Sequence, residues 1–328
     1  MDKSMNKRVY GILGISSLWA NWNADFSGYP KSLSDGRVFG SDKALKYPMK
    51  KMWDNEGQKV LYIKSMKVTE GKKGESALVP RSLRERYEFL FGASDLKDVK
   101  EVLKNLMASV DVKNFGATFA EAGCNIAITG AVQIGQGFNK YEDTTSEEQQ
   151  ILSPFRDATA TKKNKDNEDE EAKNSTLGTK IGSSEAHYFY PFVINPLAYK
   201  EMANLKDETG KDLEITEGYT DEDYQNFKRT ALVSATAFAT NSKIGCENEF
   251  AVFVETKIDT YLPNLSEYVE FEKQDDKNCI KIEKLVELLK EMADTIDSIE
   301  IYYNPYTTIL EGDIKDAKYF NILTLKEV

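Results

Sequence analysis

The order in which strand-like and helix-like segments alternate is the feature that most constrains the fold. Residues 9–19 (VYGILGISSLW) form an apolar, β-rich run broken by glycine, which predicts a central strand. Residues 42–53 carry apolar side chains at helical spacing, and Ser41 or Asp42 can cap the start, so this segment predicts a helix. Pro48 predicts a kink or a short two-part helix.

The same alternation continues through the middle of the chain. Residues 115–119 and 125–134 are two extended pieces that indicate a hairpin or adjacent strands. Residues 221–240 have helical spacing, and residues 249–256 (EFAVFVET) predict another strand. The resulting βαββαβ order is that of an α+β, ferredoxin-like (RRM-like) fold, whose open sheet face often lies against single-stranded RNA.

Two long insertions interrupt this core. Residues 57–110 contain a Gly/Lys-rich turn (EGKKGES) and a mixed-charge helix (RSLRERYEFLF), and form a lateral insertion. Residues 141–186 form a loop of a length that indicates a functional or a disordered segment, and its middle, TKKNKDNEDEEAKNS, cannot bury a core. Behind the core we expect an amphipathic helix near 281–295 and a short strand at 298–303.

We therefore expect a single elaborated domain over residues 1–328. We expect its core to comprise residues 1–56, 111–140 and 187–257. The C-terminal helix and strand should lie in residues 258–328.

The charge is divided unevenly along the chain. The net charge of −11 argues against a polyanionic partner, but residues 1–140 carry 22 Lys and Arg against 15 Asp and Glu, whereas residues 141–328 carry 21 against 39. Nucleic-acid binding requires a local basic surface rather than a basic protein. The alternative is that acidic and basic residues simply solvate different faces.

Most catalytic classes lack their signatures. There is one histidine, His187, and its surroundings (SEAHYFYPF) predict a strand and a structural imidazole. No dinucleotide-binding, phosphate-loop, HExxH, GxSxG or kinase motif is present, and Cys124, Cys246 and Cys279 indicate buried thiols. We expect no enzyme, no cofactor and no metal. Without a leader or an apolar run of roughly 20 residues, we expect a cytoplasmic protein with no membrane partner.

The loop over residues 20–37 (ANWNADFSGYPKSLSDGR) is rich in groups that suit phosphate and ribose contacts. Trp22, Phe26 or Tyr29 could stack on bases, although the loop could equally be a turn with an aromatic plug. Asp25 could hold a divalent cation for phosphodiester cleavage or be a capping residue.

A basic stripe follows this loop. Lys43, Lys46 and Lys50 are spaced three and four residues apart, so they share one helix face. Such a stripe is either a solvated face or, beside the polar loop, a track for a nucleic-acid backbone.

Several longer motifs point to a family: ANWNADFSGYP, FGSDKALKYPMKKMW, DVKNFGATFA, ITGAVQIGQGF, and SPFRDATATKKNK with NSTLGTK and EAHYFYPFVINP. They resemble the backbone subunit of type I-B CRISPR interference complexes, the repeat-associated family that forms the crRNA-covering filament of Cascade. The resemblance covers most of the chain up to about residue 257.

The resemblance implies an RRM-like palm, fingers from 57–110 and a thumb hairpin from 141–186. It also implies a non-catalytic subunit that binds guide crRNA, contacts copies of itself and other Cascade subunits, and meets target DNA through guide pairing. The matched motifs carry over these RNA-binding residues: Asn21, Asn23, Ser27, Lys43, Lys46, Lys50, Asn114, Phe115, Gln133, Ser153, Phe155, Arg156 and Lys180.

Phe155 is either a wedge against a base or a residue packed at the thumb root, and the acidic tip at 166–171 (DNEDEE) should lie away from the guide.

Two alternative functions stay open. One is a metal-dependent ribonuclease subunit using Asp25, by analogy with related type III backbone subunits. The other is a ferredoxin-like protein-interaction module that binds no nucleic acid.

Overall fold

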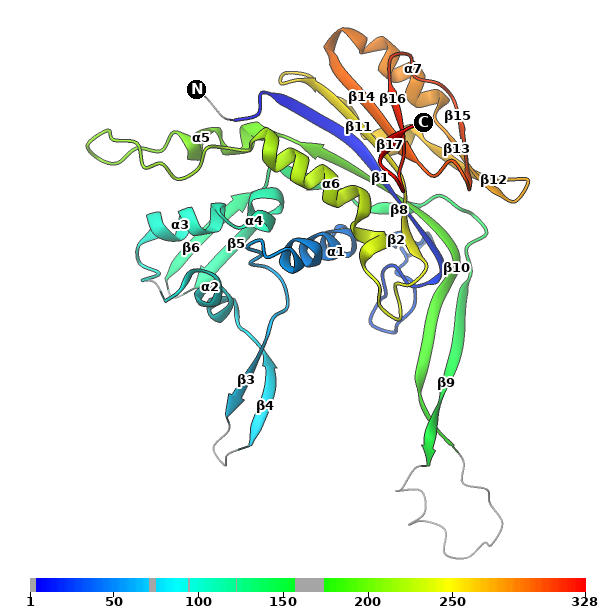
Figure 1. Ribbon diagram of the computed structural model, residues 1–328, viewed down its shortest axis with the longest axis horizontal. Helices are drawn as coiled ribbons and strands as arrows, with labels where there is room; N and C mark the ends of the chain where they lie inside the picture. The colour runs from blue at the N-terminus through cyan, green and yellow to red at the C-terminus, as the bar shows by residue number, and fades with distance from the viewer. Residues whose placement is uncertain (1–3, 71–74, 94, 122, 157–173) are drawn as a thin grey trace, which may run out of the picture.

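The apolar N-terminal run becomes β1 (Lys7–Ala20), which lies inside the main sheet of the computed structural model (Figure 1). The structure describes residues 4–70, 75–93, 95–121, 123–156 and 174–328. The main sheet runs in the order β17 (Lys326–Glu327), β16 (Lys318–Asn321), β14 (Ile296–Tyr303), β11 (Cys246–Lys257), β1, β10 (Asn174–Ile194), β8 (Gly137–Asn139) and β2 (Phe39–Gly40). Beside this path, β7 (Val132–Ile134) and β9 (Ser146–Arg156) both pair with β10.

Both faces of the sheet centre are buried. Val9 and Leu13 of β1 belong to a core shared with helices α1 (Asp42–Asn55) and α6 (Asp221–Ala237), whereas Tyr10 and Ile12 belong to a second core shared with the C-terminal segment. Because successive strand residues point to opposite faces, burial of both faces requires apolar residues at nearly every position. This explains why β1 reads as a continuous apolar run.

The two predicted helices are confirmed. In α1 (Asp42–Asn55) the Ser41 side chain accepts a hydrogen bond from the backbone N–H of Ala44, and the helix continues through the buried Pro48. The expectation of a two-part helix is therefore wrong. In α6 (Asp221–Ala237) Thr220 and Asp223 form a capping box, which fixes the start that the sequence predicts.

The predicted second and third strands are corrected by the structure. Phe115 ends helix α4 (Val110–Phe115), and β5 (Gly116–Glu121) and β6 (Cys124–Thr129) form the expected hairpin, but as a separate two-stranded sheet. The hairpin packs on the first insertion, where the Phe119 and Tyr87 rings lie 5.3 Å apart. The alternating pattern identified strands but could not identify the sheet that they join. In the main sheet, β10 pairs with β1 on one side and with β7 and β8 on the other.

Two hairpins extend from the same side of the body (Figure 1). The first insertion contains β3 (Met66–Glu70), β4 (Ser76–Pro80), α2 (Leu83–Phe91) and α3 (Val99–Met107), including the predicted mixed-charge helix. The second hairpin is made of β9 and the outer part of β10; β10 is one strand, so the expected boundary at 186/187 falls within it. Residues 71–74 of the predicted Gly/Lys-rich turn, and 157–173 between β9 and β10, lie outside the described residues.

The C-terminal segment contains more structure than the sequence indicated. The expected helix is α7 (Glu283–Glu291), and the expected strand is β14, which extends the main sheet beside β11. A further sheet joins β12 (Glu270–Gln274), β13 (Lys277–Lys281) and β15 (Thr308–Glu311). Short helices elsewhere in the described residues are η2 (Pro196–Tyr199), α5 (Lys200–Ala203), η3 (Leu265–Tyr268) and η4 (Ala293–Thr295). Within the described ranges, no helix has the length and apolar character needed to cross a membrane.

Candidate nucleic-acid interface

The loop that follows β1 is fastened to the root of the β9–β10 hairpin. The Asn21 side-chain amide donates hydrogen bonds to the carbonyls of Gly28 (2.8 Å) and Ile181 (3.1 Å). The Tyr29 hydroxyl donates to the Glu148 carboxylate (2.8 Å), and Lys243 donates to the Asn21 carbonyl (2.7 Å). Loop and hairpin root therefore form one continuous surface.

The predicted loop residues divide by exposure. Asn21 is buried, and the Asn23 side-chain oxygen accepts a hydrogen bond from the Ser41 backbone N–H (2.7 Å), so both side chains hold the loop in place. Ser27 is exposed at the surface of the loop. The aromatic side chains also divide: Trp22 is buried, with its indole N–H 2.5 Å from the Tyr190 hydroxyl, whereas Phe26 is fully exposed. Trp22 is thus the aromatic plug, and Phe26 is free to contact a ligand.

Asp25 organises the loop. Its Oδ1 accepts hydrogen bonds from the backbone N–H groups of Ser27 (2.8 Å) and Tyr29 (3.0 Å). The described part of the chain holds no group of three or more His, Cys, Asp or Glu side chains placed to bind one metal ion. The carboxylate thus performs the capping role that the sequence left open as one of two alternatives.

The three stripe lysines lie on α1 but differ in their surroundings. Lys43 is exposed and has no ion pair within the described ranges, whereas Lys46 is 2.8 Å from Asp42. Lys50 is 3.4 Å from the buried carboxylate of Asp111. The ammonium groups of Lys46 and Lys50 also lie over the Phe115 ring, at 5.1 and 5.9 Å from its centre. Lys43 is consequently the stripe cation with the least internal compensation.

The other predicted contacts lie at the junction between α4 and the sheet. Asn114 is buried; its amide donates to the Val110 carbonyl and its oxygen accepts from the Tyr219 hydroxyl, each at 2.8 Å. Gln133 is exposed on β7, and its side chain donates to the Gly130 carbonyl (2.8 Å). The structure thus joins Phe115 to the lysine stripe but gives Asn114 an internal role.

The predicted thumb residues lie on the β9–β10 hairpin. Lys180 is half-buried on β10, opposite Gln149 of β9. Ser153, Phe155 and Arg156 belong to β9, but their side chains lie outside the described residues, as does the acidic tip at 166–171.

A buried charge cluster sits where the hairpin leaves the sheet. His187 Nδ1 is 2.8 Å from Glu249 Oε2, and Nε2 is 3.0 Å from Glu185 Oε1, which Lys273 also contacts at 2.5 Å. The imidazole stacks on the Phe271 ring at 3.9 Å between centres. His187 is therefore the structural histidine that the sequence predicts.

The cluster shifts the pKa values of His187 and Glu185. Burial alone would lower the pKa of His187, but the Glu249 and Glu185 carboxylates outweigh it and raise the pKa to about 9. The hydrogen bond from His187, aided by Lys273, lowers the pKa of Glu185 to about 2 despite partial burial. The imidazole is therefore charged at neutral pH and ties β10 to β11 and β12.

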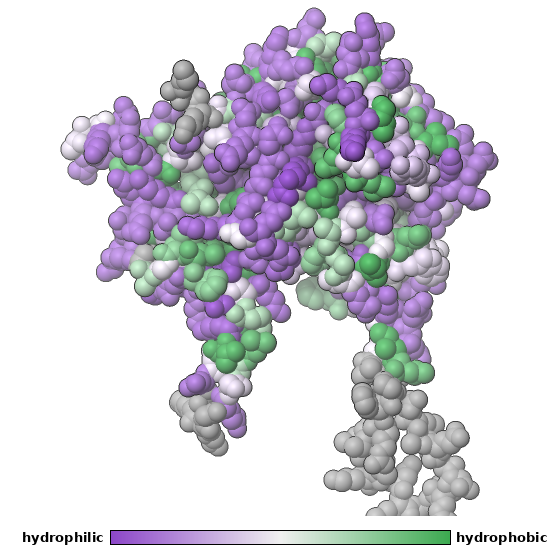
Figure 2. Space-filling model, viewed as in Figure 1, coloured by the Kyte–Doolittle hydropathy of each residue, from purple (hydrophilic) through white to green (hydrophobic). Residues whose placement is uncertain are grey.

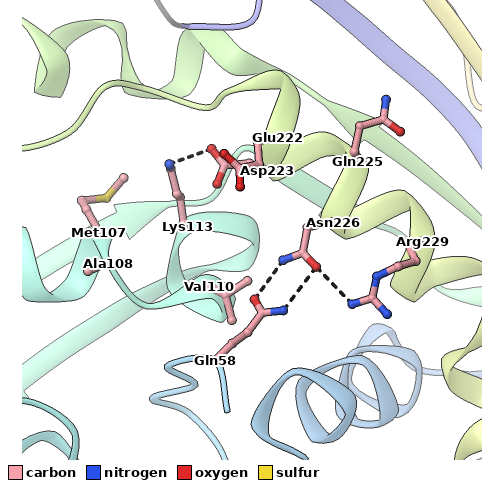
Figure 3. Close-up of a pocket in the computed structure, with 10 residues that line it drawn as sticks. All are labelled: Gln58, Met107, Ala108, Val110, Lys113, Glu222, Asp223, Gln225, Asn226 and Arg229. Carbon is pink, nitrogen blue, oxygen red and sulfur yellow. Dashed lines mark hydrogen bonds and ion pairs between the residues drawn. The ribbon is translucent and has the colours of Figure 1, made fainter. Parts of the chain in front are cut away.

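A cleft of about 610 Å³ opens between α6 and the α3–α4 segment (Figure 3). Four of its polar side chains form two pairs: Lys113 with Asp223 at 2.6 Å, and Asn226 with Gln58 at 2.9 Å. Arg229 also reaches Asn226 in this view, at 3.3 Å. Because these groups satisfy each other, they hold α6 against the inserted segment.

Sequence reasoning missed Trp19, which is 58% exposed at the end of β1 and has a positive φ of 50°. It belongs to an apolar run that predicts a buried strand, so the sequence carries no signal that its ring faces solvent.

Comparison with known proteins agrees with this architecture. Residues 7–297 match the family described as CRISPR-associated protein Cas7. A chain of a solved "CRISPR RNA-guided surveillance complex, pre-nicking" superposes with a TM-score of 0.54 at 14% identity, covering 96% of each chain. No curated protein matches the sequence. Since the family match spans most of its length, this chain belongs to the Cas7 family of CRISPR-associated proteins.

Proposed function

We propose that this chain is a non-catalytic, crRNA-binding backbone subunit of a type I-B Cascade complex. Copies would polymerise along the guide RNA in the cytoplasm, beside other Cascade subunits, and present the guide for pairing with target DNA. In this proposal the palm is the ferredoxin-like part of the main sheet, the fingers are the first insertion and the thumb is the β9–β10 hairpin.

One observation carries the proposal beyond family membership. The strands β11, β1, β10 and β8 are neighbours in that order, all antiparallel, with α1 following β1 and α6 following β10 along the chain. A βαββαβ chain numbered from its first strand gives this 4-1-3-2 order when it folds as an RRM-like sheet. The basic α1 and the fastened loop lie beside this sheet and offer an RNA chain the Lys43 ammonium, the Ser27 hydroxyl and the exposed Phe26 ring.

The test measures binding of fluorescently labelled single-stranded RNAs by anisotropy at several salt concentrations. The wild type should bind unrelated sequences equally, with affinity that falls steeply as salt rises. Lys43→Glu with Lys180→Glu should weaken binding of all sequences and reduce the slope of log affinity against log salt by roughly one per lysine. Lys50 is left intact because a glutamate beside the buried Asp111 would destabilise the fold.

Lys315→Glu with Lys318→Glu, two exposed changes in the acidic C-terminal half, is the matched control. Equal RNA affinity of the wild type and the double variant would contradict the proposed surface. Protein that purifies without a 260 nm excess and binds no RNA would favour the interaction-module alternative.

The ribonuclease alternative is tested separately. The assembled complex is incubated with complementary RNA and Mg²⁺, and the wild type is compared with Asp25→Ala. Cleavage that requires the metal and disappears in the variant would favour the nuclease. We expect intact RNA in both samples, because the Asp25 carboxylate already accepts two backbone hydrogen bonds within its own loop.

A further inference from the structure

Trp19 combines two features that packing does not explain. It lies between Leu18 and Ala20, which pair with Glu185 and Ser183 of β10, yet its φ of 50° leaves the extended conformation of the strand. A positive φ is uncommon for a bulky residue and costs free energy. The ring gains little burial in return, because 58% of the residue remains exposed.

The ring borders a small hollow in the root of the β9–β10 hairpin. The hollow measures about 170 Å³ and is also lined by Glu147, Gln149, Lys180 and Gly182. In the hairpin register Glu147 is opposite Gly182 and Gln149 is opposite Lys180, so the four positions lie on one face of the hairpin. A Cβ at Gly182 would lie 3.2 Å from the backbone of Ala20, which shows how closely this face approaches the end of β1.

The chemistry of this hollow fits a nucleotide. An exposed indole offers a flat surface for any base, an ammonium group beside it can neutralise a phosphate, and an amide can contact a base edge. The Glu147 carboxylate disfavours a phosphate on its side of the hollow, so the phosphate would lie toward Lys180. Among the residues that line the hollow, Trp19 alone has a large apolar side chain, so a protein partner would find no broad apolar patch inside it.

We propose that Trp19 is a base-stacking platform for one nucleotide of single-stranded RNA, with Lys180 beside it to contact the phosphate. This inference rests on the proposed RNA-binding function and adds a specific base contact to it. The hollow lies at the junction of β1 with the hairpin, so it would fix one nucleotide at the root of the proposed thumb.

The chain carries its own probe for this contact. Of its three tryptophans, Trp22 and Trp53 are buried, at 1% and 0% exposure, so the emission that acrylamide can quench comes mainly from Trp19. Unlabelled oligouridylate should shield this emission from acrylamide. An abasic oligonucleotide of equal length, which keeps the phosphates but has no base to stack, should shield it much less.

Substitutions separate the ring from the backbone. Trp19→Gly removes the ring and adopts a positive φ without steric cost, so the turn is retained. Its affinity for fluorescein-labelled oligouridylate, measured by anisotropy, should fall by roughly 5-fold to 150-fold. Trp19→Phe, which keeps an aromatic face, should bind much closer to wild type, and Tyr261→Ala, an exposed aromatic residue elsewhere, should bind as wild type does.

The outcomes are distinguishable. If the wild type binds oligouridylate but Trp19 stays open to acrylamide and Trp19→Gly binds equally well, the stacking inference is wrong while the proposed function stands. If Trp19 becomes shielded on raising the protein concentration without RNA, the ring contacts another copy of the chain and the inference is also wrong. If the wild type binds no RNA, the proposed function fails first and the inference fails with it.

Discussion

The two halves of β10 are one strand in two environments. The inner half, residues 186–194 (AHYFYPFVI), lies between β1 and the β7–β8 strands, and Tyr188, Tyr190 and Phe192 are buried in the core. The outer half, residues 174–185, pairs with β9, keeps its pairing with β1 only near its inner end at Ser183 and Glu185, and carries mainly small and polar residues.

On the molecular surface, the projecting hairpins nevertheless carry some exposed hydrophobic side chains. Figure 2 shows hydrophilic residues over much of the body with hydrophobic patches among them, and hydrophobic groups also on the projecting hairpins, where Val68 and Leu78 of β3–β4 and Leu152 of β9 are exposed. Burial in the core specifies the fold, whereas the part of the hairpin beyond its fastened root pairs only with its partner strand and is available for contacts. The comparison teaches that one strand can serve stability at one end and recognition at the other.

Truncation in the inner half should produce the largest effect. Phe192→Ala removes a buried ring that packs on Phe227 and Phe253 at 5.6 and 5.3 Å between centres. We expect a loss of about 3–5 kcal/mol in the free energy of unfolding, measured with urea. Leu152→Ala, an exposed control in the outer hairpin, should change it by less than about 0.5 kcal/mol. Equal losses in both variants would remove the distinction between the halves.

Substitutions at the junction between the two halves of β10, at His187, should have the next largest effect on stability. His187→Gln leaves the Glu249 carboxylate buried without its cationic partner, so we expect a loss of about 3 kcal/mol in urea unfolding at pH 6.5. Adding Glu249→Gln should recover part of that loss, because the unpaired buried charge is then absent. A double variant as unstable as the sum of the two single variants would show that the pair is not coupled.

The same cluster should make stability depend on pH. Because the pKa of His187 is raised from 6.5 to about 9 on folding, its contribution is complete below pH 6.5 and is lost as the pH rises through 9. The stability difference between wild type and His187→Gln should shrink by about 2–3 kcal/mol between pH 6.5 and 9.5. A constant difference would show that the imidazole is not charged in the folded protein.

At acid pH, the stability of the protein should depend on Glu185. Because folding lowers the pKa of this carboxyl from 4.5 to about 2, its contribution is present above pH 4.5 and is lost as the pH falls toward 2. Glu185→Gln should therefore flatten the acid side of the stability profile relative to wild type, with the alkaline side largely retained.

A substitution in the outer half should have the smallest effect on stability but should weaken RNA binding. Lys180→Ala should leave the urea midpoint within about 0.5 kcal/mol of wild type but weaken RNA binding by about 1 kcal/mol, roughly fivefold. Lys318→Ala is the control for removal of a lysine charge. A destabilised Lys180→Ala, with unchanged affinity once corrected for the folded fraction, would assign Lys180 to the fold instead.

The sequence by itself determined the elements with strong patterns. The β1 run, helices α1 and α6, strand β11 and the C-terminal helix and strand lie where periodicity and capping place them, because these signals are local. The motifs between Ala20 and Pro196 also indicate the CRISPR-associated family on their own, because they preserve residue types in order over long stretches.

Only the tertiary structure decided which strands share a sheet and which polar side chains face solvent. The hairpin at 116–129 has strand periodicity but joins a separate sheet, and the polar outer half of β10 forms a strand that composition presents as a loop. Asn21, Asn114 and Lys50 resemble surface ligands in the sequence but are engaged by carbonyls, a tyrosine and a buried carboxylate from distant segments. Such partners meet only when the chain folds, because exposure and ion pairing depend on contacts between residues far apart in sequence.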